Sequence, residues 1–404
     1  MSFGFPTETI KEGEIKVLVP KLEAYMEKPQ DYAPSKAPVF YNPVMETNRD
    51  LAVLALQAHQ KTLNREVVVS EPLTGCGLRG VRFAVEVAGV SKVVLNDINP
   101  QSVKVTRHNA KLNGVEDKVE VHNLDGNLFL SQHAAPKKRF DYVDVDPFGT
   151  PVTYLDSALR ALRKGGMIAL TATDMAPLCG VHRKACIRKY GGNPLRTEYC
   201  HELAVRLLVG CTTMMAAKHE IGIKVLFSHS IDHYVRAYAT VSNGAKVADK
   251  SIQQMGYILH CFSCFHRETA QGIVSPLKRV CPSCGAKLSV AGPLWLGKIA
   301  DQSFCSSMEE TLEKSSLKNK RKLLKILTLI HDETDAPVTY YGVDKICDKL
   351  NLPISSQTKV MNSIKAQGFQ AIPTHFNSRG IKTDAPADVI RDVITKLAAK
   401  MREN

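Results

Sequence analysis

This sequence lacks the usual marks of secreted, membrane-spanning and low-complexity proteins. Residues 1–16 contain no basic start followed by an apolar stretch, so we expect no signal peptide. No apolar run approaches the length of a bilayer span, and we find neither an internal repeat nor a biased tract. We therefore expect a cytoplasmic protein with no membrane partner. Nothing in the sequence suggests a subunit interface, so we expect a monomer.

Acidic residues are in the minority. The chain of 404 residues carries 53 Lys and Arg against 40 Asp and Glu, a formal charge of +13. Such an excess suits a polyanionic partner, because each cation that neutralises a phosphate releases a condensed counterion. Many basic proteins bind no nucleic acid, so charge alone does not decide the question. The length predicts two or three domains.

Short β-branched runs alternate with helical stretches from residue 66 to about residue 243, which predicts a mainly parallel sheet covered by helices. The last two predicted strands are separated by only five residues, too few for a crossover helix, so they should pair antiparallel. A parallel sheet that ends in an antiparallel strand resembles the class I methyltransferase fold. The predicted strands are residues 67–70, 92–96, 119–122, 142–145, 166–171, 224–228 and 234–241.

The rest of the chain changes character twice. Residues 29–43 are proline-rich and should form an extended arm, whereas residues 248–292 have little apolar periodicity and carry paired cysteines. Further on, we expect a long basic helix at residues 308–331, then shorter helices and a small extended element. We therefore predict a catalytic domain with its arm at 1–247, a cysteine segment at 248–300, and a mainly helical, winged-helix-like α+β domain at 301–404.

The strand ends carry the residues of a nucleotide-type cofactor site. Gly75 and Gly77 follow the first strand, where they allow a sharp turn and a close approach to a ligand. Asp97 follows the second strand and can accept hydrogen bonds from both hydroxyls of a ribose. Asp125 and Gly126 follow the third strand, where the acid suits either an adenine amino group or a simple turn. Dinucleotides and S-adenosylmethionine both fit this pattern.

The fourth strand ends in Asp146-Pro147-Phe148, at the edge where a parallel sheet places its ligands. It resembles the Asp-Pro-Pro-Tyr loop of enzymes that methylate amino groups. A carboxylate there can hold an exocyclic amine and aim its lone pair at a methyl-sulfonium carbon. The aromatic ring offers a face on which the base can stack.

Taken together, the chain resembles the tRNA (guanine-26-N2)-dimethyltransferase family over nearly its whole length. Six stretches in the same order carry the resemblance: residues 40–50, 77–83, 95–98, 144–149, 171–180 and 374–384. One departure lies in the glycine turn, where Cys76 stands in place of a hydroxyl residue.

The resemblance implies that S-adenosylmethionine is the cofactor and tRNA the substrate. Arg49 and Arg79 would grip the methionine carboxylate of the cofactor, Asp97 its ribose, and Asp125 with Gly126 its adenine.

In the same way, Asp146 would accept the amine proton, with Pro147 adjoining it and Phe148 stacking on a flipped guanine. The C-terminal domain and the basic run at residues 318–325 would hold the tRNA backbone, although that run also fits a solvated helix face.

Two cysteine pairs, Cys261 with Cys264 and Cys281 with Cys284, are separated by sixteen residues. This spacing predicts a structural zinc site with four thiolate ligands, and the alternatives are two free-thiol pairs or an iron–sulfur cluster. The other cysteines are scattered and read as small buried residues. His182, His201 and His233 show no ligand spacing.

Three other functions compete with this one. An amino-methylase for ribosomal RNA or DNA adenine would share the Asp146 loop, but the match at residues 374–384 argues against it. A nicotinamide-dependent dehydrogenase would use the same glycines and Asp97, yet gives the Asp146 loop no role. A non-catalytic zinc-dependent RNA-binding module would not need the cofactor residues.

Overall fold

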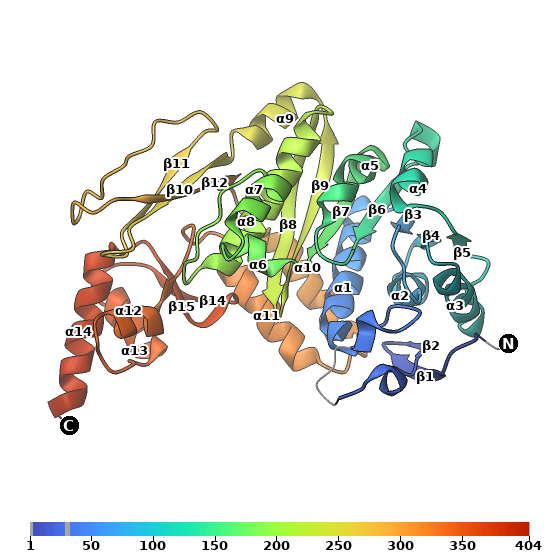
Figure 1. The fold of residues 1–404 in the computed structure, drawn as a ribbon, viewed down its shortest axis with the longest axis horizontal. Helices are drawn as coiled ribbons and strands as arrows, with labels where there is room; N and C mark the ends of the chain where they lie inside the picture. Colours follow the sequence, from blue (N-terminus) through green and yellow to red (C-terminus); the bar gives the residue numbers. More distant parts are fainter. Residues whose placement is uncertain (1–2, 29–32, 404) are drawn as a thin grey trace.

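The computed structural model describes residues 3–28 and 33–403, with a seven-stranded sheet at its centre (Figure 1). The strand order is β5-β4-β3-β6-β7-β9-β8, and the first five run parallel. All seven predicted strands are present, so the methyltransferase-like α/β sheet is confirmed. Their bounds are β3 Val67–Glu71, β4 Val90–Asn96, β5 Val119–His122, β6 Phe140–Val145, β7 Leu162–Ala172, β8 Ile221–Ile231 and β9 Tyr234–Asn243.

The last two strands pair antiparallel, as predicted, and the structure adds where they lie in the sheet. β9 pairs antiparallel with both β7 and β8 and is therefore second from the edge. Helix α8 (Cys200–Ala217) separates β7 from β8 in the chain and lets β8 run in the common direction at the edge. The link from β8 to β9 is too short for a crossover, so β9 folds back into the space beside β7.

Helices cover both faces of this sheet, and each face has its own hydrophobic core. One core includes side chains from α1, α2 and α3, and the other includes side chains from α4, α5 and α8. Within residues 3–28 and 33–403, no helix has both the length and the apolar character needed to cross a membrane. The helix bounds are α1 Glu46–Leu63, α2 Leu78–Glu86, α3 Pro100–Leu112, α4 Gly126–Gln132, α5 Leu155–Arg160, α6 Met175–Leu178 and α7 Arg183–Tyr190.

The N-terminal region forms a hairpin that the sequence did not predict. Strands β1 (Thr7–Glu12) and β2 (Ile15–Pro20) pair antiparallel. The side-chain amide of Asn109 on α3 accepts from the backbone N–H of Leu18 at 2.7 Å and donates to its carbonyl at 2.9 Å. This exchange imitates one step of a sheet ladder and fixes the hairpin against α3.

The proline-rich arm after this hairpin is less extended than we predicted. Residues 29–32 lie outside the described part of the chain. In the remainder, short 3-10 helices occur at Ala33–Ser35 and Pro43–Met45. In the second of these, the side chain of Asn42 accepts from the backbone N–H of Val44 at 3.0 Å, which starts the turn that leads into α1.

The cysteine-containing segment forms a small sheet of its own, with the order β11-β10-β12. All pairs in it are antiparallel. It projects from the main body beside the C-terminal elements (Figure 1). Its bounds, with the helix that precedes it, are α9 Ala245–Ile252, β10 Met255–His260, β11 Arg267–Gln271 and β12 Ser289–Trp295.

The C-terminal part is an α+β region, as predicted, but the long basic helix is wrong. It consists of two helices, α10 (Gln302–Lys314) and α11 (Lys320–Asp332), whose buried side chains join the core around α1. They are therefore packed as part of the catalytic body. A separate core combines three helices and the sheet β13-β15-β14 with Phe265 of the cysteine-containing segment. The bounds are β13 Tyr341–Gly342, α12 Val343–Lys349, α13 Gln357–Lys365, β14 Ala371–Thr374, β15 Asn377–Thr383 and α14 Ala387–Glu403.

Buried charges fasten this C-terminal region to the catalytic body. Lys382 on β15 is 1 % exposed, and its ammonium lies 2.9 Å from the carboxylate of Glu202 on α8. Glu333, just after α11, accepts from the hydroxyl of Thr374 at 2.6 Å. Burial alone would raise the pKa of Glu202, but Lys382 and Arg206 lower it to about 2. Residues 374–384 therefore help to hold the C-terminal region against α8 and the end of α11.

Candidate active site and metal centre

A cavity of about 1200 Å³ lies where β3, β4 and β6 end. It is larger than most pockets for a single small molecule, which span roughly 300–1000 Å³. The structure brings seven of the ten predicted catalytic and cofactor residues to its wall: Arg49, Gly75, Arg79, Asp97, Asp146, Pro147 and Phe148. This edge of the sheet is where ligands of parallel α/β folds bind.

The glycine turn and Asp97 form one rigid unit. Gly75 and Gly77 have φ values of 57° and 76°, which side-chain-bearing residues rarely adopt. A Cβ added at Gly77 would lie only 2.6 Å from Thr106, so this turn also needs glycine for packing against α3. The carboxylate of Asp97 accepts from the backbone N–H of Gly75 at 2.8 Å and of Asn99 at 2.9 Å.

Arg49 is already held by an acid from the N-terminal hairpin. Its guanidinium donates two parallel hydrogen bonds to the carboxylate of Glu12, both at 2.6 Å. A third bond reaches the carbonyl of Asn42 at 3.1 Å. Both charged side chains are buried, and the pair fixes one edge of the guanidinium.

Arg79 is bound to the acids of the fourth strand. It donates to the carboxylate of Asp144 at 2.6 Å, to the side chain of Asn48 at 2.9 Å, and also to the carboxylate of Asp146. The arginine is 5 % exposed, so these bonds form away from bulk water. In this structure Arg79 therefore positions Asp146, a contact that the sequence did not suggest.

Asp146 is an ionised carboxylate in a largely buried position. Burial by itself would raise its pKa, but the charges of Arg79 and Arg236 outweigh that effect and lower the pKa below its ordinary value. An ionised carboxylate is a pure hydrogen-bond acceptor. The geometry therefore provides an acceptor, turned toward the cavity, for a group that donates N–H.

Behind Asp146 lies a buried network centred on Asp144 and Arg236. Both side chains are fully buried, and the guanidinium of Arg236 donates to the carboxylate of Asp144 and to the hydroxyl of Tyr238. Tyr142 donates its hydroxyl proton to the same carboxylate at 2.7 Å. With Arg79, this network fixes the position of Asp146 from inside the protein.

Phe148 leaves its ring free at the mouth of the cavity. It is 68 % exposed, and its ring meets that of Phe40 edge to face, with 4.6 Å between centroids. Two hydrogen bonds join the loop after Phe148 to the segment 171–180. The backbone N–H of Gly149 donates to the hydroxyl of Thr173 at 2.8 Å, and the carbonyl of Gly149 accepts from the backbone N–H of Thr173 at 2.9 Å. Phe40 was missed because it lies in the arm, far from the glycine turn in sequence.

Three predicted residues do not line the cavity. Gly77 serves the turn, as described above. Asp125 is exposed and caps α4, accepting from the backbone N–H of Asn127 at 2.9 Å and of Leu128 at 3.1 Å. A Cβ at Gly126 would lie 3.0 Å from the ring of Tyr154, which does line the cavity. Gly126 therefore leaves room for that ring.

The sequence also missed Glu71, the last residue of β3. It lines the cavity, is 4 % exposed, and accepts from the hydroxyl of Thr74 at 2.9 Å. Burial raises its pKa to about 8, even though Arg79 favours the charged form. Its position at the carboxyl end of a central strand was the available signal.

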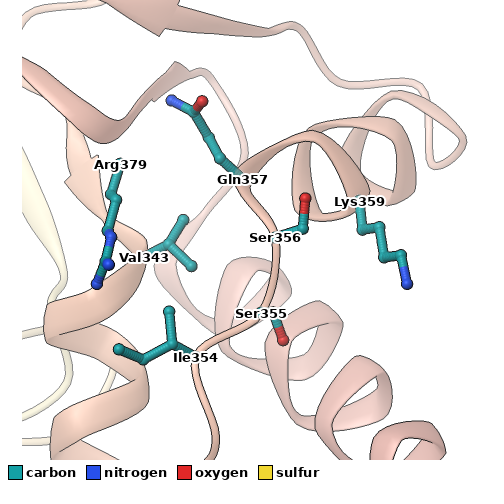
Figure 2. Close-up of a pocket in the computed structure, with 7 residues that line it drawn as sticks. All are labelled: Val343, Ile354, Ser355, Ser356, Gln357, Lys359 and Arg379. Carbon is teal, nitrogen blue, oxygen red and sulfur yellow. The ribbon is translucent and has the colours of Figure 1, made fainter.

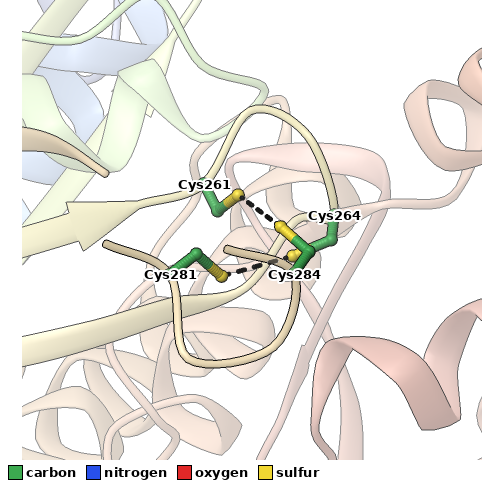
Figure 3. Close-up of side chains that lie close together, drawn as sticks. All are labelled: Cys261, Cys264, Cys281 and Cys284. Carbon is green, nitrogen blue, oxygen red and sulfur yellow. Dashed lines mark hydrogen bonds between the residues drawn. The ribbon is translucent and has the colours of Figure 1, made fainter. Parts of the chain in front are cut away.

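The four predicted metal ligands come together at the tips of two similar turns (Figure 3). The sulfur atoms of Cys261 and Cys284 are 3.5 Å apart, and those of Cys264 and Cys281 are 3.6 Å apart. A tetrahedral zinc–thiolate site has Zn–S bonds of about 2.3 Å, which places its sulfurs roughly 3.8 Å from one another. The cluster therefore fits zinc closely.

The other cysteines follow the predicted pattern only in part. Cys76, Cys186, Cys305 and Cys347 are buried, whereas Cys179, Cys200 and Cys211 are partly accessible. Cys179 and Cys200 also lie beside His201, for which we had recognised no ligand pattern. Cys179 directly follows α6 and Cys200 begins α8, twenty-one residues later, so no short spacing in the sequence could reveal the group.

A second hollow, of about 410 Å³, lies in the C-terminal region (Figure 2). Lys359 and Arg379 line it together with the start of α13, and among residues 3–28 and 33–403 no carboxylate does so. Its wall is therefore positively charged.

Comparison with known proteins was consistent with this geometry. Residues 13–395 match the family of N2,N2-dimethylguanosine tRNA methyltransferases. A tRNA (guanine(26)-N(2))-dimethyltransferase of Methanothermobacter thermautotrophicus is 42% identical, covering 96% of this chain and 99% of its own. The tRNA (guanine(26)-N(2)/guanine(27)-N(2))-dimethyltransferase of Aquifex aeolicus is 37% identical over 93% of both. The structure of Trm1 from Pyrococcus horikoshii with S-adenosyl-L-methionine superposes with a TM-score of 0.84 at 34% identity, covering 96% of this chain and 99% of that one.

Proposed function

Because this chain belongs to the N2,N2-dimethylguanosine tRNA methyltransferase family, we propose that it methylates the exocyclic N2 of guanine 26 in tRNA. Two methyl groups are added in turn, each from S-adenosylmethionine. The observation that carries the proposal is the ionised Asp146, held by Arg79 at the wall of a cavity with an exposed aromatic ring.

The cofactor end of the cavity is built from fixed polar groups. Asp97 keeps acceptor capacity for two ribose hydroxyls beyond the two backbone bonds that it already holds. Arg49 would bind the methionine carboxylate through the part of its guanidinium that Glu12 leaves open. The cofactor, when bound, supplies an electrophilic methyl group on a sulfonium.

Asp146 acts on the substrate amine. An exocyclic amine conjugated with a purine is a poor nucleophile, so its lone pair must be aimed at the reacting carbon. Asp146 accepts a hydrogen bond from the N–H and holds the amine in that direction. Attack leaves a proton on a positively charged nitrogen, which is a strong acid. Asp146 can accept that proton although its own pKa is low. The second transfer needs the remaining N–H turned toward the same carboxylate.

The guanine must leave its stack to reach this position. Phe148 offers an exposed face at the mouth of the cavity, and Phe40 braces that ring from the side. Base–aromatic stacking contributes roughly 1–3 kcal/mol per base, which offsets part of the cost of unstacking.

A basic strip beside the cavity suits the tRNA backbone. It comprises Lys318, Arg321, Lys322 and Lys325, all exposed on one face of α11 and its leading turn. Lys322 donates to the hydroxyl of Thr47 at 3.2 Å, and Thr47 lies next to the cavity-lining segment that includes Met45 and Arg49. The strip would therefore meet phosphates close to the flipped base. The positive wall of the C-terminal hollow offers a second contact.

Zinc at Cys261, Cys264, Cys281 and Cys284 would be structural. All four coordination positions are filled by protein sulfurs, which leaves none for a substrate. Its part is to hold the two turns of the small sheet together.

The test uses S-adenosylmethionine carrying a labelled methyl group, an unmodified tRNA transcript and nucleoside analysis. The native chain should label N2-methylguanosine and then N2,N2-dimethylguanosine at position 26. Asp146→Ala should abolish the label, and Asp249→Ala, which removes an exposed carboxylate on α9, should not. A transcript with adenine at position 26 tests whether guanine 26 is the target, and one with adenine at position 27 tests whether guanine 27 is also methylated. Full activity of Asp146→Ala would refute the assigned role.

A further inference from the structure

Two thiols and one imidazole, all common metal ligands, converge near the catalytic cavity. They are Cys179, just after α6, and Cys200 and His201, the first two residues of α8. The two sulfurs and one imidazole nitrogen all lie within 4.8 Å of one another. The group is separate from the four-cysteine cluster, and the proposed methyl transfer gives it no task.

The spacing suits a tetrahedral metal ion. Zinc binds thiolate sulfur at about 2.3 Å and imidazole nitrogen at about 2.0–2.1 Å, so neighbouring ligand atoms stand roughly 3.5–3.8 Å apart. The three atoms need to close by at most about 1.3 Å, which side-chain rotation can supply. Two thiolates and one imidazole are ligands that zinc prefers over magnesium or calcium.

The environment distinguishes these thiols from cysteines that only fill space. Cys186, on the neighbouring α7, is fully buried, whereas Cys179, Cys200 and His201 are all partly accessible. Cys200 is also the first residue of an eighteen-residue helix, where the peptide dipoles favour a negatively charged ligand. An ion could therefore reach the group, and water could occupy a fourth position.

The group lies in a segment that also forms the catalytic cavity. Thr173 lines the cavity, and its hydroxyl accepts a hydrogen bond from the backbone N–H of Gly149. The same segment continues through α6 to Cys179. An ion at this position would join that segment to the start of α8. Glu202, the next residue on α8, is the partner of Lys382.

We propose that Cys179, Cys200 and His201 form a second metal site, which takes a zinc-type divalent ion and leaves one coordination position open to water. Binding replaces the protons of the two thiols, which are released to solvent, and uses a lone pair of the neutral imidazole. Three protein ligands with an open fourth position distinguish this site from the closed four-cysteine site.

Metal analysis of the full-length protein, purified from zinc-supplemented cells, tests the proposal. The native chain should hold two zinc ions, and Cys179→Ser and Cys200→Ser should each hold one. Cys211→Ser removes another partly accessible thiol of α8 and should keep two. One ion per native chain would overturn the proposal, as would two ions that persist in both Cys179→Ser and Cys200→Ser.

Cobalt substitution gives a readout on the native chain and does not depend on how well a variant folds. Protein from cobalt-supplemented cells should show the absorption of a four-thiolate site together with that of a mixed thiolate–imidazole site. The mixed component should be absent from Cys200→Ser. A native spectrum with the four-thiolate component alone, or a disulfide between Cys179 and Cys200 in the native protein, would overturn the proposal.

Discussion

The basic strip on α11 allows a quantitative test of how the protein holds tRNA. Lys318, Arg321 and Lys325 are exposed and follow one another along one face of the helix and the turn that leads into it. Replacing all three with alanine removes three charges without touching the buried face formed by Leu323 and Leu327. We therefore expect a folded variant whose affinity for tRNA depends less on salt.

The magnitude follows from counterion release. Each phosphate contact adds about 0.7–0.9 to the slope of log affinity against log salt, so three lost contacts should reduce the slope by about 2–3. Across a fourfold rise in salt, the native affinity should then fall roughly 20- to 40-fold further than that of the variant. Filter binding of labelled tRNA over a salt series measures both slopes.

The control removes the same amount of charge at the amino ends of the strands, whereas the cavity lies at their carboxyl ends. Lys137, Lys138 and Lys164 are exposed and lie at the amino ends of β6 and β7, away from the cavity. Their triple alanine variant should keep the native slope. Equal slopes for the native chain and the α11 variant, or an equal loss in the control, would refute the role of the strip.

Three further predictions concern buried charge and metal. Lys382→Met should lower the free energy of unfolding by about 1.5–3 kcal/mol in denaturant titrations, because Glu202 then keeps Arg206 but loses the buried cation on its other carboxylate oxygen. Glu71 has a raised pKa of about 8, so its contribution to stability is fully present near pH 4 and is lost as the pH rises toward 8. In thermal unfolding, Glu71→Gln should therefore become more stable relative to the native chain as the pH rises across that range. Removing zinc with a chelator, or Cys281→Ser, should lower the melting temperature of the protein and increase proteolysis of the small sheet around residues 255–295.

These three predictions can each fail in a defined way. Lys359→Met, which changes an exposed lysine, is the control for Lys382→Met, and equal small effects would show that the buried pairing is unimportant. A constant difference between Glu71→Gln and the native chain from pH 5 to 8 would contradict a raised pKa. An unchanged melting temperature after complete removal of zinc would contradict a structural role for the metal.

The sequence by itself determined the elements and the local geometry of the sites. Strands were predictable because β-branched runs alternate with helical stretches, and the turn at Gly75 because glycine adopts the backbone angles needed there. The four zinc ligands were predictable because each Cys-x-x-Cys pair turns two sulfurs toward one point within a few residues. Asp97 and Asp146 were found because parallel strands end at a common edge.

Only the tertiary structure decided which distant groups meet. The place of β9 between β7 and β8, the packing of α10 and α11 against α1, and the bond from Arg79 to Asp146 all join residues far apart in the chain. Cys179 and Cys200 come together for the same reason. Local patterns reflect backbone preferences over a few residues, whereas these contacts depend on how whole helices and strands pack, and that is set by the summed burial of both cores.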